Sequence, residues 1–93
     1  MDTPIPMDTR RHTLPIDVGI RLREARHRTF YTIREFAAVV GIDKSYLIRL
    51  ENGDRAPSTT TAYQLIDVLG IDGDSELAVD LLRYAIEGVG NDR

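Results

Sequence analysis

The side chains best suited to chemistry lie close together in residues 44–49, where Lys44, Ser45 and Arg49 supply hydrogen-bond donors. Leu47 and Leu50 recur at the spacing of a buried helical face, so we expect the three polar side chains to project outward together. The planar guanidinium of Arg49 can hold a pair of acceptors with two parallel hydrogen bonds, whereas the ammonium of Lys44 acts as a point charge. These groups favour binding to a partner rich in acceptors.

The sequence contains no motif for catalysis or metal binding. It has no cysteine, and His12 and His27 are far apart without ligand spacing around them. No nucleophile, base and orienting group share a known motif, and the glycines form no phosphate-binding loop. We therefore expect neither an enzyme nor a bound cofactor, metal ion or small-molecule ligand.

Residues 32–53 predict two short helices joined by a turn, and these helices must position the donors. Thr32 with a glutamate three residues later fits a capping box at the first helix. Gly41 supplies the positive φ that ends this helix. Asp43 can cap the second helix, and Gly53 stops it. Helices this short need partners before and after them to bury their apolar faces.

Apolar residues at helical spacing predict three further helices, over residues 17–28, 58–69 and from 74 or 75 to about 87. No strand signal persists, so the predicted class is all-α. We expect three parts: a disordered arm over residues 1–15, a helical domain over 16–71, and a last helix with a polar tail over 72–93.

The arm carries three prolines and the basic run Arg10, Arg11 and His12. This run could follow a phosphate backbone or lie in a minor groove. An unstructured leader without a binding role is the alternative.

The charge is unevenly distributed along the chain, although the net charge is only −3. Residues 10–62 carry ten Lys and Arg against six Asp and Glu, and residues 63–93 carry two against seven. Such asymmetry indicates an anion-binding face, and an ordinary solvated surface is the alternative. No apolar run approaches the length of a membrane span and no signal peptide is recognisable, so we expect a cytoplasmic protein.

Residues 19–71 resemble the helix-turn-helix domain of the lambda-repressor-like family, also called the Cro/C1 or xenobiotic-response-element (XRE) type. The matching residues, in the family's order and spacing, are Gly19–Arg26, Thr32, Phe36–Ala37, Gly41–Gly53, Pro57–Ser58 and Leu69–Ile71. The resemblance implies a domain of five short helices whose third helix lies in the major groove of DNA. It also implies a regulator of transcription, because members are mostly dimeric repressors, activators and antitoxins.

The resemblance also implies a role for particular side chains. A helix in the major groove reads base edges with its outward residues, which in helix 43–52 are Lys44, Ser45, Ile48 and Arg49. Phosphate contacts are implied for Thr32, Asn52, Arg55 and Arg23. Arg26 and Glu51 match the positions of an ion pair that joins the first and third helices, and two independent surface charges are the alternative.

The sequence departs from the family pattern at several apolar positions. Ile33 stands where glutamine is usual, so a side-chain contact with DNA is lost there, and Phe30 stands where a glycine-like residue is common. If Ile33, Val39 and Ile48 join Tyr46 in one exposed patch, a protein partner could bind there. Val39 could instead cover a neighbouring helix.

The leading hypothesis is a sequence-specific DNA-binding regulator, most simply a repressor, that acts as a homodimer on a two-fold operator in double-stranded DNA of the nucleoid. The broad apolar stripe of the last helix is the expected dimer interface, with Leu77, Leu81, Leu82, Ala85 and Ile86. Packing of that stripe on its own domain is the alternative. The second hypothesis is a protein-interaction module on the same fold, either antitoxin-like or an adaptor.

Overall fold

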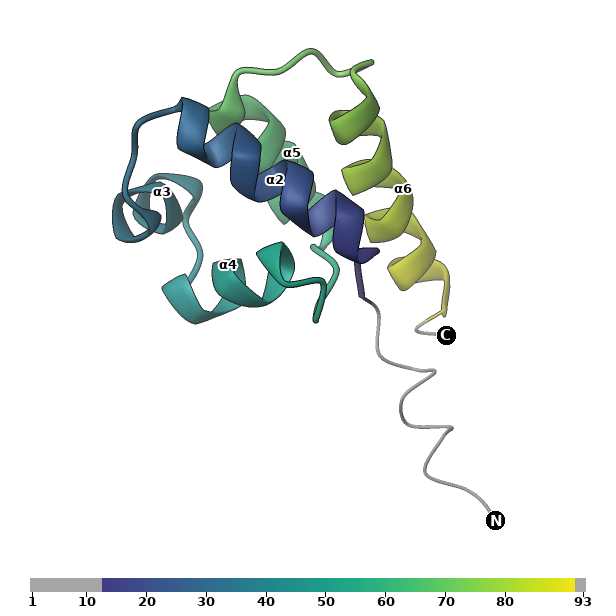
Figure 1. The fold of residues 1–93 in the computed structure, drawn as a ribbon. Helices are drawn as coiled ribbons and strands as arrows, with labels where there is room; N and C mark the ends of the chain where they lie inside the picture. Colours follow the sequence, from purple (N-terminus) through teal and green to yellow (C-terminus); the bar gives the residue numbers. More distant parts are fainter. Residues whose placement is uncertain (1–12, 92–93) are drawn as a thin grey trace.

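A computed structural model of the chain describes residues 13–91, which form five helices and no strand. The helices are α2 (Ile16–Arg28), α3 (Ile33–Val40), α4 (Lys44–Glu51), α5 (Thr59–Leu69) and α6 (Glu76–Asn91) (Figure 1). The predicted all-α class is confirmed. The basic run at residues 10–12, which the sequence suggested as a DNA-binding arm, lies outside the described residues.

All five helices contribute to one apolar core. Its largest fully buried side chains are Leu22 of α2, Phe36 of α3, Leu47 and Leu50 of α4, Leu65 of α5 and Leu81 of α6. Burying a side chain of this size contributes about 1.5–3 kcal/mol, so each short helix is stabilised mainly by the others. None of the helices within residues 13–91 combines the length and apolar character needed to cross a bilayer.

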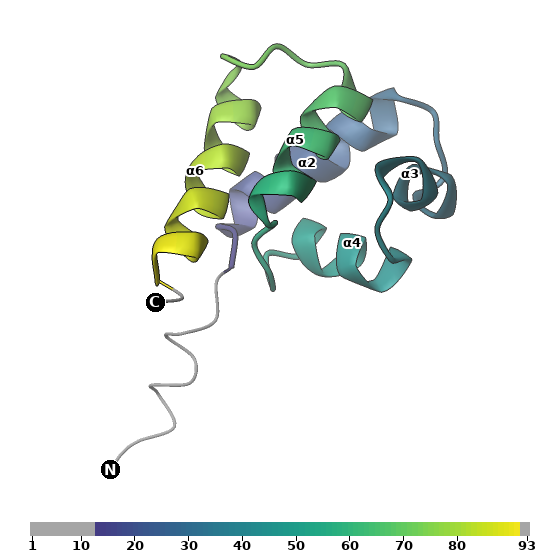
Figure 2. The same ribbon diagram turned by 180° about the vertical axis from the view of Figure 1, so that it is seen from behind.

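The packing leaves one long side of α4 free. α4 contacts α2 and α3, while α3 also contacts α5. α6 packs on α5 and α2 at the other end of the molecule. Figures 1 and 2 show the same arrangement from opposite sides, with α4 at the lower edge and no other helix below it.

Local hydrogen bonds fix the start and the end of α3 as the sequence predicts. The Oγ1 of Thr32 accepts the backbone N–H of Glu35 at 3.1 Å, and Glu35 Oε1 accepts the N–H of Thr32 at 3.0 Å. Gly41 ends the helix at φ 91°. The rings of Tyr31 and Phe36 lie 6.3 Å apart across the helix start, which fixes the direction in which the chain enters α3.

Two predicted details of the helix ends are wrong. Asp43 stands at the N-cap of α4, but its side chain accepts no capping hydrogen bond; the first turn is exposed, so water can satisfy its N–H groups. The second wrong detail is the end of α6. The helix begins after Ser75, whose Oγ accepts the N–H of Ala78 at 3.3 Å. It continues to Asn91 instead of ending near Glu87, because each glycine lowers helix stability by only about 1 kcal/mol.

Two of the residues expected in a dimer interface lie in the core of their own chain. Leu81 and Ala85 of α6 are 0% and 1% exposed there, which leaves them little surface for a second copy. Leu77 and Leu82 are half-buried and pack against the same core. Of the five expected residues only Ile86 is exposed, with 59% of its surface accessible. The broad stripe is needed because α6 covers both α5 and α2.

Candidate nucleic-acid interface

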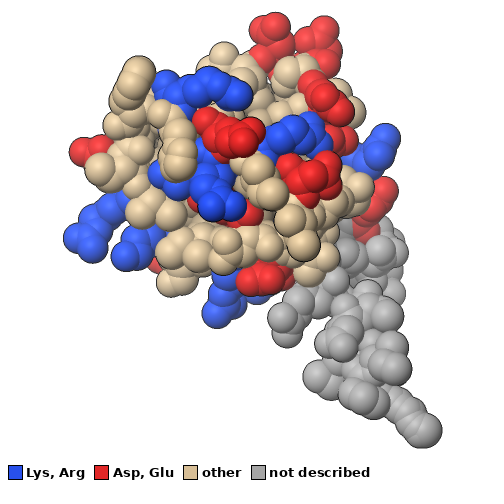
Figure 3. Space-filling model, viewed as in Figure 1, with Lys and Arg blue, Asp and Glu red and all other residues tan. Residues whose placement is uncertain are grey.

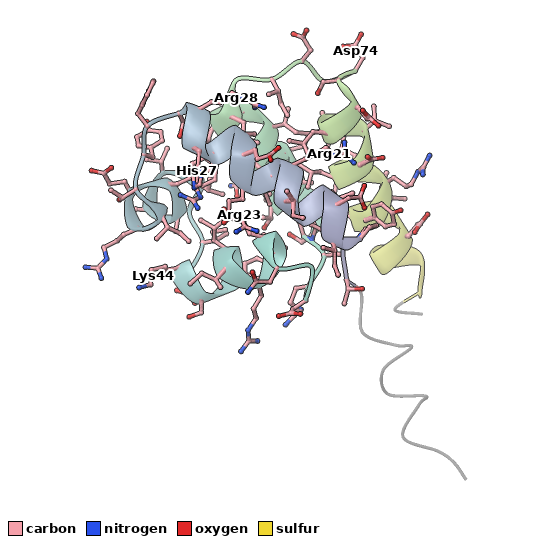
Figure 4. All side chains as sticks on the ribbon, in the orientation of Figure 1. Arg21, Arg23, His27, Arg28, Lys44 and Asp74 are labelled. Atoms are coloured by element: carbon pink, nitrogen blue, oxygen red, sulfur yellow. The ribbon has the colours of Figure 1, made fainter. Side chains whose placement is uncertain are left out.

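The free side of α4 presents polar side chains to solvent. Ser45, Ile48, Arg49 and Asn52 are exposed, and the last three follow Ser45 by three, four and seven residues, which places all four on one side of the helix. Leu47 and Leu50 on the opposite side are fully buried. Lys44 is the first residue of α4 and projects from the end of the helix (Figure 4). The donors therefore share an accessible surface that the core holds outward.

Two contacts fix α4 against α2. Arg26 Nε donates to Glu51 Oε2 at 2.6 Å and Arg26 Nη2 donates to Glu51 Oε1 at 3.1 Å. The Arg26 and Glu51 side chains are only 9% and 5% exposed, so the paired charges are largely shielded from water. Close by, Gly19 lies against the backbone carbonyl groups of Leu50 and Glu51, where a Cβ atom would overlap them. The angle of α4 is thus set by buried contacts.

The start of α3 has the properties of an anion-binding position. The N–H of Glu35 is accepted by the Thr32 hydroxyl, but those of Ile33 and Arg34 have no acceptor within the helix, and the helix dipole adds partial positive charge there. Thr32 and Arg34 at this end are both exposed. Ile33, which replaces the family's usual glutamine, is half-buried and packs against the core. Only the backbone and the neighbouring side chains are therefore available to a phosphate.

The loop that follows α4 is held by several contacts. The N–H of Asp54 donates to the carbonyl of Arg49 at 2.8 Å, which closes the end of the helix. The Tyr46 hydroxyl donates to the carbonyl of Ala56 at 3.4 Å. The guanidinium carbon of Arg55 lies 5.9 Å from the centre of the Tyr46 ring. Arg55 is therefore presented from an ordered loop beside α4.

Positive charge is more frequent near α3 and α4 than near α6. In Figure 3, Lys and Arg project from the left and lower edges and also lie across the middle and at the right edge, while Asp and Glu gather most densely over the upper right, beside the loop that precedes α6. Among the described residues, Lys44, Arg49 and Arg55 have no carboxylate within ion-pair distance. Arg23 is exposed on the side of α2 that is turned toward α4 (Figure 4). These cations remain available to an anionic partner.

Arg21 is half-buried and, unlike the exposed arginines, makes its contacts within the fold. Its Nη2 donates to Asp80 Oδ2 at 2.8 Å, and Glu76 and Asp17 lie within 4 Å. The hydrogen bond to Asp80 is the main reason why the pKa of Arg21 is raised, with burial opposing it and the nearby carboxylates adding to it. Arg21 thereby ties α6 to α2.

The four apolar residues that could form one patch on the outer face differ in their exposure. Tyr46, like Ile33, is half-buried and packs against the core. Val39 and Ile48 are exposed, and about half of the surface of Val39 is accessible. Sequence reasoning missed the support that Tyr46 gives to Arg55. The one available signal was an aromatic residue in the predicted helix that leads into the loop containing Arg55. Residues 13–91 hold no cluster of three or more His, Asp or Glu that could bind a metal ion.

The chain is similar in sequence to known helix-turn-helix proteins. The family model described as helix-turn-helix matches residues 22–75. TK0539 of Thermococcus kodakarensis, named as an HTH-type transcriptional regulatory protein, is 34% identical over 71 residues. YazB of Bacillus subtilis, named as an uncharacterized HTH-type transcriptional regulator, is 42% identical over 60 residues. The matched segments cover 74% of the chain and 21% of TK0539, and 64% of the chain and 86% of YazB. No solved structure gave a significant match.

Proposed function

The chain belongs to the helix-turn-helix family of the Cro/C1 type, and on this basis we propose that it is a transcriptional regulator that inserts α4 into the major groove of double-stranded DNA. The observation that carries the proposal is the free side of α4, where donors face solvent from a helix fixed by a buried ion pair. The major groove of B-form DNA admits one α-helix.

Each exposed side chain of α4 has a chemical match on a base edge. Arg49 can donate two parallel hydrogen bonds to O6 and N7 of guanine, and Lys44 can donate to the same atoms as a single charge. The hydroxyl of Ser45 can bind several base edges. Ile48 can contact the methyl group of thymine. Together these four residues would read the sequence of the operator.

Contacts with the DNA backbone would hold α4 in register. Thr32 and the first N–H groups of α3 precede α4 in the chain, and Asn52 and Arg55 follow it. These groups would contact backbone phosphates while α4 lies in the groove. Arg23, which lies on α2 above α4, extends this set.

A homodimer would place two copies of α4 in successive major grooves, about 34 Å apart. Because Leu81 and Ala85 are buried, the proposed contact between copies uses Ile86 with Val79 and the half-buried Leu82. These three residues recur at spacings of three and four along one side of α6. The solution mass should fall to that of a monomer for Ile86→Lys. A monomeric wild-type chain on its operator would contradict the dimer.

Selection of bound duplexes from a random-sequence pool tests the DNA-binding proposal. The enriched sequence should bind with log K falling by about 0.9 per neutralised phosphate for each tenfold increase in salt. Arg49→Ala should weaken binding to the enriched duplex by at least about tenfold and relax the preferred sequence. Arg28→Ala is the matched control, since Arg28 is an exposed arginine at the end of α2, away from α4 (Figure 4). Equal binding of all sequences at every salt concentration would contradict the proposal.

Protein binding is a second candidate function because apolar side chains in and just before α3 are exposed. Phe30 is 92% exposed and Val39 is 52% exposed. In an antitoxin-like or adaptor protein these side chains would contact the partner. Lys44→Ala with Arg49→Ala separates the two functions, since a DNA reader should lose its operator while a pure protein binder should retain its partner.

A further inference from the structure

The most specific arrangement not yet explained lies between Tyr46 and the loop after α4. Tyr46 is half-buried, and its ring packs against the apolar core on one side. Its hydroxyl donates to the carbonyl of Ala56, and its ring lies under the guanidinium of Arg55. One side chain of α4 therefore contacts the next loop at two successive residues.

The position of Tyr46 on α4 relates this arrangement to DNA. Tyr46 and Arg49 are three residues apart, so they are neighbours on the surface of the helix. Arg49 belongs to the exposed side that we propose to face the bases. Arg55 above the Tyr46 ring therefore lies along the border of that same side, where the DNA backbone would pass.

The contact with the ring leaves Arg55 able to bind a phosphate. An aromatic ring attracts the guanidinium through its face, while the N–H donors point outward from the edge of the planar group. The exposed side chain of Arg55 has no carboxylate partner within ion-pair distance among the described residues. Without the ring, Arg55 would lose more conformational freedom on binding.

We propose that Tyr46 is a positioning residue for DNA binding: it holds Arg55 and the loop of residues 52–57 in the conformation that contacts a backbone phosphate. This inference rests on the proposed DNA-binding function and adds a residue that contacts no DNA itself. Tyr46 would raise the affinity for DNA because Arg55 is already held in its binding conformation before DNA binds.

The test measures binding of the full chain to the enriched duplex and to a mixed-sequence duplex of about 30 base pairs, over a range of salt concentrations. Tyr46→Leu keeps apolar volume but removes the ring face and the hydroxyl. It should weaken binding about two- to five-fold, the range expected from losing an exposed cation–π contact. The salt dependence should stay unchanged, because Arg55 still reaches its phosphate. Arg55→Ala should instead lower the slope of log K against log salt by about 0.9.

Two further variants separate positioning from a general structural role. Tyr46→Phe keeps the ring under Arg55 and should retain most of the affinity. In the Arg55→Ala background, Tyr46→Leu should have no additional effect, since the group that it positions is absent. Tyr63→Leu is the matched control, because Tyr63 is an exposed tyrosine on α5.

The outcomes distinguish this inference from the function on which it rests. If Tyr46→Leu weakens binding equally with and without Arg55, or leaves it unchanged while Arg49→Ala abolishes it, the positioning role is wrong and the DNA-binding function stands. If neither duplex binds the wild-type chain, both proposals are overturned. Thermal unfolding of each variant identifies any loss of binding that comes from loss of the fold.

Discussion

Arg26 of α2 donates two hydrogen bonds to the carboxylate of Glu51 at the end of α4, at 2.6 Å and 3.1 Å, and both side chains are buried. The pair joins the helix that would enter the groove to the longest helix of residues 16–71. It therefore connects the stability of the fold to the orientation of the proposed DNA-binding surface.

Breaking this pair from one side should be costly. Arg26→Met or Glu51→Leu leaves one buried charge without its partner, so each should lower the free energy of unfolding by about 3–5 kcal/mol. The double variant should lose clearly less than the sum of the two, because no unpaired charge remains. Urea denaturation measures all three. Additive losses would show that the two charges act independently.

Gly19→Ala should separate α2 from α4. The new Cβ would overlap the carbonyl of Glu51 and lie 3.0 Å from that of Leu50, and a backbone contact cannot be relieved by a rotamer change. We expect a loss of about 1–3 kcal/mol in unfolding free energy, together with weaker DNA binding. Gly73→Ala is the control, since a Cβ there meets nothing within 4 Å. Comparable losses for the two variants would contradict this account.

Phe30→Gly should stabilise the fold. Phe30 follows the C-cap of α2 at φ 68°, a conformation that costs a residue with a side chain about 1–2 kcal/mol and costs glycine little. Because the Phe30 ring is almost fully exposed, its removal loses few packing contacts. The midpoint of thermal unfolding should rise by about 4 °C or more. Phe30→Ala retains a Cβ and should give no such rise. A gain from alanine equal to that from glycine would show that strain is not the cause.

Asp80→Asn should loosen α6. The Asp80 carboxylate accepts the hydrogen bond of Arg21, and the partly exposed pair should contribute about 1 kcal/mol. Asp17→Asn is the control, because the Asp17 side chain is 76% exposed and its Oδ2 lies 3.5 Å from Nη2 of Arg21. Because the pKa of Arg21 is raised in the folded state, its contribution to the free energy of unfolding is complete at neutral pH and is lost only as the pH rises through that pKa. The difference in stability between wild type and Asp80→Asn should therefore be constant between about pH 6 and 9. Stability curves of both variants against pH measure this.

The features that the sequence predicted well are local ones. The capping box of Thr32 and Glu35, the glycine turn at Gly41 and the outward placement of Arg49 depend on residues within four positions of one another. The family was also recognisable from the order and spacing of short motifs over residues 19–71. These patterns act through backbone hydrogen bonds and helical periodicity, which are settled by neighbours along the chain.

The features that required the tertiary structure join distant parts of the chain. The apolar stripe of α6 could equally have met a second copy, and only the packing shows Leu81 and Ala85 in the core of the same chain. Likewise, nothing near Arg21 in the sequence indicates that it binds Asp80, which lies 59 residues further along the chain. The sequence determines which faces of the helices are apolar or charged. The pairing of these faces depends on how all the helices bury their apolar area together, and only the tertiary structure decides it.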